Sequence, residues 1–298
     1  MSTRTSRFGI SKRESHDSSN FYKRRLYHAV EQDQIRVDEI ADLPEMVVNQ
    51  IYHADSRNLD FLPDNSVHLM ITSPPYNVGK EYDENLSLDE YLSLIDDVMK
   101  EVYRVLIPGG RACVNIANVG RKPYIPIKDY INQVMLEHGF LMRGEIIWDK
   151  GASAGGSCAW GSWQSASNPV LRDVHEYISV FSKGSYTRQD HKIKDKQNTI
   201  SRDEFLEYTK SVWTFKSESA RRVNHPAPFP VELPYRLIQL YSFKDDVVLD
   251  PFCGSGSTCL AALQTARRYI GVDNNLDYVQ GAKRRLATYV EHGEDLIE

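Results

Sequence analysis

The sequence predicts an α/β fold with a largely parallel sheet, because apolar strand-like runs alternate with helical segments along much of the chain. Several of the apolar runs stop at a proline or glycine turn, as strands do at the edge of a sheet. Hydrophobic residues make up 41% and charged residues 26% of the 298 positions, which excludes a chain that is disordered over its whole length. A chain of this length is expected to bury a substantial core.

The expected elements follow one another in a regular order. Strands are expected at 66–72, 112–116, 141–148, 175–183, 245–250 and 267–273. Helices are expected around 36–50 and at 88–106, 127–138 and 259–266. The segment 88–106 has apolar residues on a wide helical face. We expect Pro108-Gly109-Gly110 to end this helix before the strand at 112–116.

The charge of the chain is unevenly distributed. The formal net charge is −5, but residues 1–25 hold seven Lys/Arg against two acids, and residues 183–222 hold ten against six. We expect residues 1–25 to form a mobile basic tail and residues 184–222 to be a basic insert. An acidic body with two basic segments fits local contact with a polyanion. Solvated loops of mixed charge would give the same counts.

The four cysteines predict neither a disulfide scaffold nor a metal site. Cys113, Cys158, Cys253 and Cys259 form no CxxC pair, and no histidine lies near one at zinc spacing. No apolar run approaches the ~20 residues that a membrane helix requires. The first residues also lack the apolar region of a signal peptide. We therefore expect a cytoplasmic protein with reduced thiols, no metal and no membrane contact.

A glycine-rich turn follows the short apolar strand that ends at Asp250. The turn 251–258 reads PFCGSGST, and the next strand ends at Asp273, 19 residues after Gly254. Glycines allow a ligand to approach the backbone, and an acid at this distance can accept both hydroxyls of a ribose. Asp250 would repel a pyrophosphate. The loop therefore favours S-adenosylmethionine over a dinucleotide, and a purely structural turn stays open.

A second turn follows the strand at 66–72. Residues 72–76 read TSPPY, and the two prolines restrict the backbone so that the Ser73 hydroxyl and nearby carbonyls can be aimed at one target. Such acceptors stabilise the charge that develops when an exocyclic amine attacks a methyl sulfonium. Tyr76 offers a ring on which a planar base can stack. The alternatives are a structural turn and a polyproline ligand of an SH3-type domain.

These residues resemble the DNA amino-methyltransferases, which use S-adenosylmethionine. Residues 73–76 match the family motif (D/N/S)PP(Y/F/W), and residues 250–258 are similar to the cofactor motif DPF-x-GSGT, with one additional serine before Thr258. Residues 225–230 (HPAPFP) are similar to a third motif of the family. The order of the three motifs resembles that of the permuted β group.

The resemblance implies a class I methyltransferase fold, which is Rossmann-like, with a mostly parallel seven-stranded sheet, an antiparallel last strand and a circularly permuted motif order. It implies one catalytic domain formed by residues 26–183 and 223–298. The catalytic residues implied are Ser73, Pro74, Pro75 and Tyr76. The cofactor-binding residues implied are Asp55, His225, Phe229, Asp250, Phe252, Gly254, Ser255, Gly256, Thr258 and Asp273.

Two of these assignments have simpler structural alternatives. Asp55 resembles the acid that contacts the adenine amino group, but it would also serve as a turn cap. His225 would equally pack between its neighbouring prolines. Asp273 is the residue expected to hold the ribose.

The resemblance also implies an activity. Serine in the first motif position is associated within the family with cytosine N4, and Asp or Asn with adenine N6. The expected protein is a sequence-specific DNA methyltransferase, cytosine-N4-specific, of a prokaryotic restriction–modification system. It is expected at the nucleoid, and the resemblance is compatible with a homodimer and a cognate restriction endonuclease as partner. An adenine-N6 enzyme, an enzyme that acts on RNA or protein, and a DNA-binding module without activity are the alternatives.

The target would be a base flipped out of double-stranded DNA. The basic insert 184–222 would then supply phosphate and base-edge contacts, as a target-recognition segment. Trp160 and Trp163, in a stretch rich in Gly and Ser, would clamp the DNA or fill the gap left by the base, or else cover the edge of the core.

Overall fold

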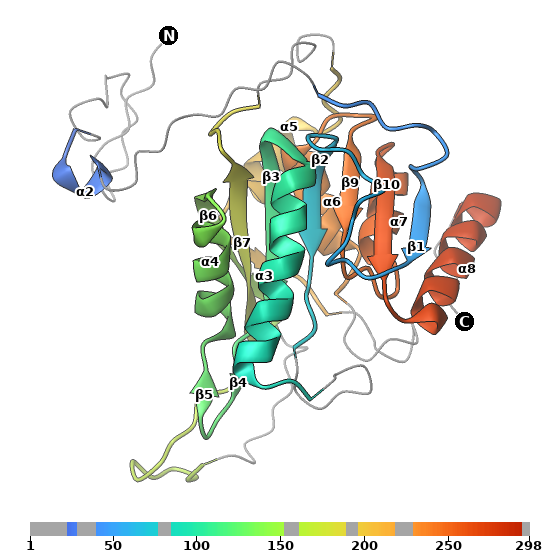
Figure 1. The fold of residues 1–298 in the computed structure, drawn as a ribbon. Helices are drawn as coiled ribbons and strands as arrows, with labels where there is room; N and C mark the ends of the chain where they lie inside the picture. The colour runs from blue at the N-terminus through green and yellow to red at the C-terminus, as the bar shows by residue number, and fades with distance from the viewer. Residues whose placement is uncertain are drawn as a thin grey trace. The chain divides into compact units, whose positions relative to one another are not determined.

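The structure is a computed structural model that describes residues 23–28, 40–76, 85–151, 161–188, 196–217 and 229–293 (Figure 1). The chain divides into two units, Met1–Ile35 and Arg36–Glu298. The described part of the first unit contains one helical turn, α2 (Arg25–His28). Residues 1–22 of the expected basic tail lie outside the described residues.

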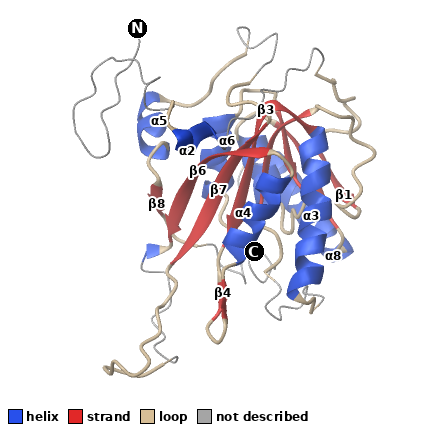
Figure 2. Ribbon diagram, turned by 60° about the vertical axis from the view of Figure 1, so that its left-hand side comes forward, coloured by secondary structure: helices blue, strands red, loops and turns tan. Residues whose placement is uncertain are grey.

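The second unit contains an eight-stranded sheet. In spatial order its strands are β1 (Gln50–His53), β10 (Arg268–Asp273), β9 (Val247–Asp250), β2 (Val67–Thr72), β3 (Leu106–Ile116), β7 (His175–Lys183), β6 (Phe140–Asp149) and β8 (Val212–Thr214). The first five strands are parallel, β7 is antiparallel to both of its neighbours, and β8 is parallel to β6. The predicted mostly parallel α/β fold is confirmed. Figure 2 shows β8, an eighth strand in addition to the seven expected, at the edge beside β6.

Helices cover both faces of this sheet (Figure 1). On one face lie α3 (Leu88–Val105) and α4 (Ile127–Glu137), whose buried residues share a core cluster with Met70. On the other face, α5 (Arg202–Tyr208), α6 (Glu232–Tyr241) and α7 (Ser257–Gln264) share a cluster with Leu69 and Ile71. Because every residue of β2 is buried, its run is apolar rather than alternating.

Two smaller parts complete the architecture of the second unit. The helix α8 (Leu276–His292) packs near the β1 edge and shares a third core cluster with Ile51 and α7. A short antiparallel hairpin consists of β4 (Val119–Gly120) and β5 (Tyr124–Ile125). No helix in the described ranges is long and apolar enough to cross a membrane.

The helix expected around 36–50 is wrong where the structure describes it. Residues 40–49 form loops and turns that lead into β1. Pro44 cannot donate the hydrogen bond of a helix interior, and Asn49 has a left-handed φ of 57°. Of the apolar residues whose spacing suggested a helix, Val47 packs against the core from this loop and Ile51 lies in β1, so their spacing reflects packing rather than a helix. Residues 36–39 lie outside the described part.

The expected role of Pro108-Gly109-Gly110 is also wrong. These residues lie inside β3 rather than between a helix and a strand. The pairing of β2 with β3 shifts between Val67↔Leu106 and Leu69↔Arg111, so the extra residues form a bulge. Gly109 has a φ of +76°, and a Cβ there would lie 2.1 Å from the Thr187 carbonyl oxygen. Only glycine fits this close backbone approach.

Part of the segment 184–222 is integrated into the core. Trp213 of β8 is 1% exposed, and its indole N–H donates to the Tyr208 carbonyl at 3.1 Å. At the opposite edge from the strands' carboxyl ends, the buried Asp246 pairs with Arg188 and, at 2.7 Å, with Lys196. These contacts anchor the described ends of the segment to the body of the second unit.

Candidate active site

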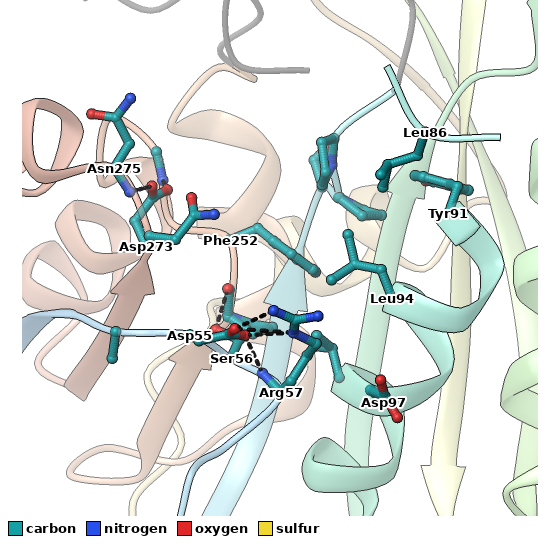
Figure 3. Close-up of a pocket in the computed structure, with 18 of the residues that line it drawn as sticks. Asp55, Ser56, Arg57, Leu86, Tyr91, Leu94, Asp97, Phe252, Asp273 and Asn275 are labelled. Atoms are coloured by element: carbon teal, nitrogen blue, oxygen red, sulfur yellow. Dashed lines mark hydrogen bonds and ion pairs between the residues drawn. The ribbon is translucent and has the colours of Figure 1, made fainter. Parts of the chain in front are cut away.

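A cavity of about 670 Å³ lies at the carboxyl ends of β2, β9 and β10 (Figure 3). Because β2 and β9 are parallel neighbours, the loops that follow them emerge at the same edge of the sheet. A hydrogen bond of 2.7 Å from the Thr72 hydroxyl to Asp250 joins the two strand ends, which are 178 residues apart in the chain. The lining includes Ser73, Pro74, Pro75, Tyr76, Pro251, Phe252, Gly254, Asp55, Asp273 and, from α3, Glu90 and Asp97.

Asp250 is buried beside this cavity and is not part of its lining. Its carboxylate accepts hydrogen bonds from the hydroxyls of Thr72 (2.7 Å) and Thr258 (2.6 Å), and from the Phe252 N–H (3.1 Å). Burial raises the pKa of Asp250 to about 6, although these three donors oppose the shift. Asp250 therefore holds β2, the loop and α7 together.

The two glycines of the loop have different surroundings. Gly254 lines the cavity, and its N–H donates to the Asp273 carboxylate at 2.8 Å. Gly256 lies outside the lining and precedes α7 with a φ of +77°. A Cβ at Gly256 would lie 3.0 Å from the Cβ of Ala282, so α8 packs closely against this turn. Ser255 is likewise outside the lining, and its carbonyl accepts from Arg285 at 3.3 Å.

Asp273 lies at the end of β10 and faces the cavity (Figure 3). Its two oxygens accept from the N–H groups of Gly254 (2.8 Å) and Asn275 (2.9 Å). Burial raises the pKa of Asp273, and the two backbone donors oppose the shift. Each oxygen keeps a further lone pair, so the carboxylate can also accept hydroxyl donors from a ligand.

Asp55 is held by its neighbour Arg57 on the wall of the cavity (Figure 3). The guanidinium donates to both carboxylate oxygens at 2.6 to 3.0 Å, and these bonds lower the pKa of Asp55. The loop that carries Asp55 is fixed against the glycine-rich turn 251–258, because the Ser56 hydroxyl donates to the Pro251 carbonyl at 2.6 Å. Asp55 is thus an ionised acceptor whose oxygens already have one partner.

The Tyr76 side chain is fixed by a residue that the sequence did not single out. Its hydroxyl donates to Glu176 Oε2 at 3.0 Å, and burial together with this carboxylate raises the Tyr76 pKa. Asn115 Nδ2 donates to the same oxygen at 2.6 Å and lies 3.5 Å from Ser73 Oγ, while Lys150 donates to Oε1 at 2.5 Å. The sequence offered one signal for Glu176, Asn115 and Lys150, because each is a polar residue at or beside an end of a predicted strand.

Four further residues singled out in the sequence are absent from the described lining of the cavity. His225 and Trp160 are outside the described residues. Phe229 is outside the cavity lining and packs against the core cluster of α6. Trp163 is 73% exposed, and nothing in the described ranges covers most of its ring.

The charge of the cavity is suited to a cationic ligand. Four carboxylates (Asp55, Glu90, Asp97 and Asp273) and one guanidinium (Arg57) belong to the described lining. S-adenosylmethionine carries a sulfonium and a net positive charge, and it has no phosphate that these acids would repel. The described residues contain no group of three His, Cys, Asp or Glu that could hold a metal. The residues present therefore fit the expected cofactor.

A Rossmann-like sheet, an acidic cavity at its switch point and a Ser-Pro-Pro-Tyr turn in the lining of that cavity are the features expected of a class I amino-methyltransferase. Similarity to known proteins identifies the family of this chain. A family model described as DNA methylase, of the N6/N4 type, matches residues 67–284. The chain therefore belongs to the N6/N4 family of DNA methylases.

Individual relatives agree with this assignment. The type II methyltransferase M.ScaI of Streptomyces caespitosus is 31% identical over 250 residues, which cover 79% of this chain and 80% of that protein. The structure of the Thermus thermophilus protein TTHA0409 is 31% identical, with a TM-score of 0.65 over 82% of this chain and 96% of the other. A further structure of that protein is a complex with S-adenosyl-L-methionine, which agrees with the expected cofactor. The PvuII DNA methyltransferase (cytosine-N4-specific) shares the fold at 22% identity, with a TM-score of 0.62 over 78% of this chain and 84% of the other.

Proposed function

We propose that this protein transfers a methyl group from S-adenosyl-L-methionine to the N4 amino group of a flipped-out cytosine in double-stranded DNA. The observation that carries the proposal is the single cavity lined by both the Ser73–Tyr76 turn and the Phe252–Gly254 loop. A donor held by the loop would lie beside an acceptor held by the turn.

The side chains of this chain have separate tasks in the proposed reaction. When bound, S-adenosyl-L-methionine supplies an electrophilic methyl group on a sulfonium. Asp273 would accept the ribose hydroxyls and Asp55 would face the adenine amino group, so that the nucleoside half of the cofactor is held. Phe252 packs against the cofactor from the loop. The remaining described acids of the cavity favour the positively charged donor.

Ser73 acts on the acceptor. Its hydroxyl accepts a hydrogen bond from the exocyclic amine, which stabilises positive charge as the nitrogen attacks. The new bond joins nitrogen to the methyl carbon as the bond from carbon to sulfur breaks, and the methylated nitrogen then releases a proton to water. No strong base is needed, so the main contribution of the turn is alignment.

The base assignment rests on the residue type at the first position of the motif, where this chain has Ser73. The methylation of adenine at N6 is the second candidate, because the turn would present the same acceptors to an adenine amine. A place in a type II restriction–modification system is supported by the names of relatives such as M.ScaI and M.MjaI of Methanocaldococcus jannaschii. In this proposal the part of the basic segment 184–222 that follows β8 contacts the DNA around the flipped base, because Arg188 and Lys196 lie at the opposite edge of the sheet.

The test is to incubate the protein with DNA and methyl-labelled cofactor, digest the DNA and identify the labelled nucleoside. N4-methylcytosine is the expected product. N6-methyladenine alone would reject the base assignment and favour the second candidate. Label in RNA or protein acceptors, with none in DNA under the same conditions, would reject the function itself.

A further inference from the structure

Glu176 reaches the site because β7 runs against the rest of the sheet. It lies near the start of β7, whereas the Ser73–Tyr76 turn and the Phe252–Gly254 loop follow the ends of parallel strands. In an antiparallel neighbour, the beginning of the strand lies at the same edge as the ends of β3 and β6. This direction brings a carboxylate under the Ser73–Tyr76 turn, and Glu176 is only 9% exposed there.

The carboxylate of Glu176 is almost fully engaged. Oε2 accepts from the Tyr76 hydroxyl at 3.0 Å and from Asn115 Nδ2 at 2.6 Å. Oε1 accepts from the Lys150 ammonium at 2.5 Å. The transfer of a carboxylate from water into a buried site is unfavourable. An apolar side chain of similar volume often stabilises a core as well or better. The arrangement is therefore poorly explained by stability alone.

The orientation of Asn115 depends on this carboxylate. Because Nδ2 faces Glu176, the same amide nitrogen is presented to Ser73 Oγ at 3.5 Å. A rotation of the amide by half a turn would direct its oxygen at the carboxylate, which is repulsive. In the present orientation Asn115 Oδ1 has no hydrogen-bond partner among the described residues, although Asn115 is 1% exposed.

We propose that Glu176 is a positioning residue for methyl transfer, which holds the Tyr76 ring and the Asn115 amide so that the Ser73 hydroxyl meets the target amine in one geometry. The inference rests on the proposed function. Glu176 acts through hydrogen-bond acceptance, and Lys150 balances its charge. The reacting atoms are reached through Tyr76 and Ser73, since Glu176 is outside the cavity lining.

Two substitutions separate hydrogen-bond acceptance from charge. Glu176→Ala removes the acceptor for both Tyr76 and Asn115. Glu176→Gln keeps one acceptor oxygen for these two donors, while its amide faces Lys150, which is partly exposed and can move away. The matched control is Glu145→Gln on β6, which removes a carboxylate that pairs with Lys128 at 3.1 Å outside the site.

The experiment measures kcat for DNA methylation, the Kd for S-adenosyl-L-methionine by calorimetry, and the thermal midpoint of each variant. For Glu176→Ala we expect kcat to fall about 100-fold, the loss typical of a misplacement near 1 Å, with the Kd unchanged within about threefold. For Glu176→Gln we expect kcat within about tenfold of the unmodified protein, because the acceptor is retained. The Glu145→Gln control should keep its kcat.

Three results would overturn the inference. A folded Glu176→Ala variant with a kcat within threefold of the parent would remove any positioning role. Equal losses in the Ala and Gln variants would assign the effect to charge instead of acceptance. A Kd that weakens as much as kcat falls would indicate a general disturbance of the site. Absence of DNA methylation by the unmodified protein would refute the proposed function itself, and is distinguished by that measurement.

If Glu176→Ala does not fold, Tyr76→Phe tests the same contact with a smaller change. It deletes only the hydroxyl that donates to Glu176. We expect kcat to fall about tenfold with an unchanged Kd, since one hydrogen bond to a charged group is lost. An unchanged kcat in this variant would contradict the inference.

Discussion

Replacing Asp250 by Asn should change how the stability of the protein depends on pH. The folded chain holds the Asp250 pKa at about 6, because the carboxylate is buried. The unfolded chain has the ordinary value, 3.8. Well below pH 3.8 the group is protonated in both states, so folding carries no ionisation penalty. Between about pH 3.8 and 6 the unfolded chain ionises while the buried carboxyl group stays protonated, so the folded protein loses stability as the pH rises through this window.

The magnitude follows from the two pKa values. A difference of about two units corresponds to about 3 kcal/mol of unfolding free energy. The wild-type chain loses about 2.5 kcal/mol of this between pH 4 and 7, because the unfolded group is already partly ionised at pH 4. Asn cannot ionise and is nearly the same size. Its oxygen can accept from Thr72 and Phe252, and its amide can donate to the Thr258 hydroxyl, which rotates to accept. The variant should therefore fold.

The assay is urea unfolding of both proteins at several pH values from 4 to 7.5. The stability of Asp250→Asn minus that of the wild type should rise by about 2.5 kcal/mol over this pH range, because other titrating groups cancel in the difference. Asp42→Asn, at an exposed position, is the control for loss of one carboxylate. A difference that stays constant within about 0.5 kcal/mol would refute the reasoning.

Three further substitutions test the division of roles in the site. Ser73→Ala should lower kcat by about 100-fold with a cofactor Kd within threefold, measured by steady-state methylation and calorimetry, because its partner is the base. The partly exposed Thr288→Ala on α8 is the control, and equal loss of kcat and of cofactor affinity would contradict this role of Ser73. Asp273→Ala should weaken cofactor binding about tenfold, since it removes a charged acceptor of the ribose, with kcat at saturation nearly retained; an unchanged Kd would contradict it. Gly256→Ala should lower the unfolding free energy by about 1–2 kcal/mol, because its φ is +77° and α8 lies close; full stability in thermal unfolding would show that the turn can relax.

The elements with strong local signals were predictable. The β2 segment is buried throughout, so its sequence is a mostly apolar run. The α3 segment has a wide apolar face, and this helix begins at a capping box formed by Ser87 and Glu90. Their positions follow from short-range rules. The carboxyl ends of parallel strands meet at one edge of a sheet. The turn 73–76 and the loop 250–258 could therefore be assigned to one site.

The errors arose where tertiary contacts decide the local structure. Pro108-Gly109-Gly110 is a turn signal by composition, but the pairing of β2 with β3 accommodates it as a bulge. Val47 and Ile51 have helical spacing, but Val47 packs against the core from a loop and Ile51 lies in β1. In both places a partner strand or a core surface, which is distant in sequence, overrides the local preference.

The site residues Asn115, Lys150 and Glu176 could not be assigned from sequence for a related reason. Their contact depends on the direction and register of β7 between β3 and β6. Asp250 was predicted to bind the cofactor, and this stays a prediction. Its three protein donors indicate that any effect on the cofactor acts through the position of the loop.

In the proposed reaction the turn after β2 holds the target base and the loop after β9 holds the methyl donor, both in one cavity. A crystal structure of the protein with S-adenosyl-L-homocysteine tests it most directly. We expect the ribose at Asp273, the adenine near Asp55, and the sulfur between Phe252 and Ser73. A ligand bound outside this cavity, or one whose sulfur is directed away from the Ser73 turn, would contradict it.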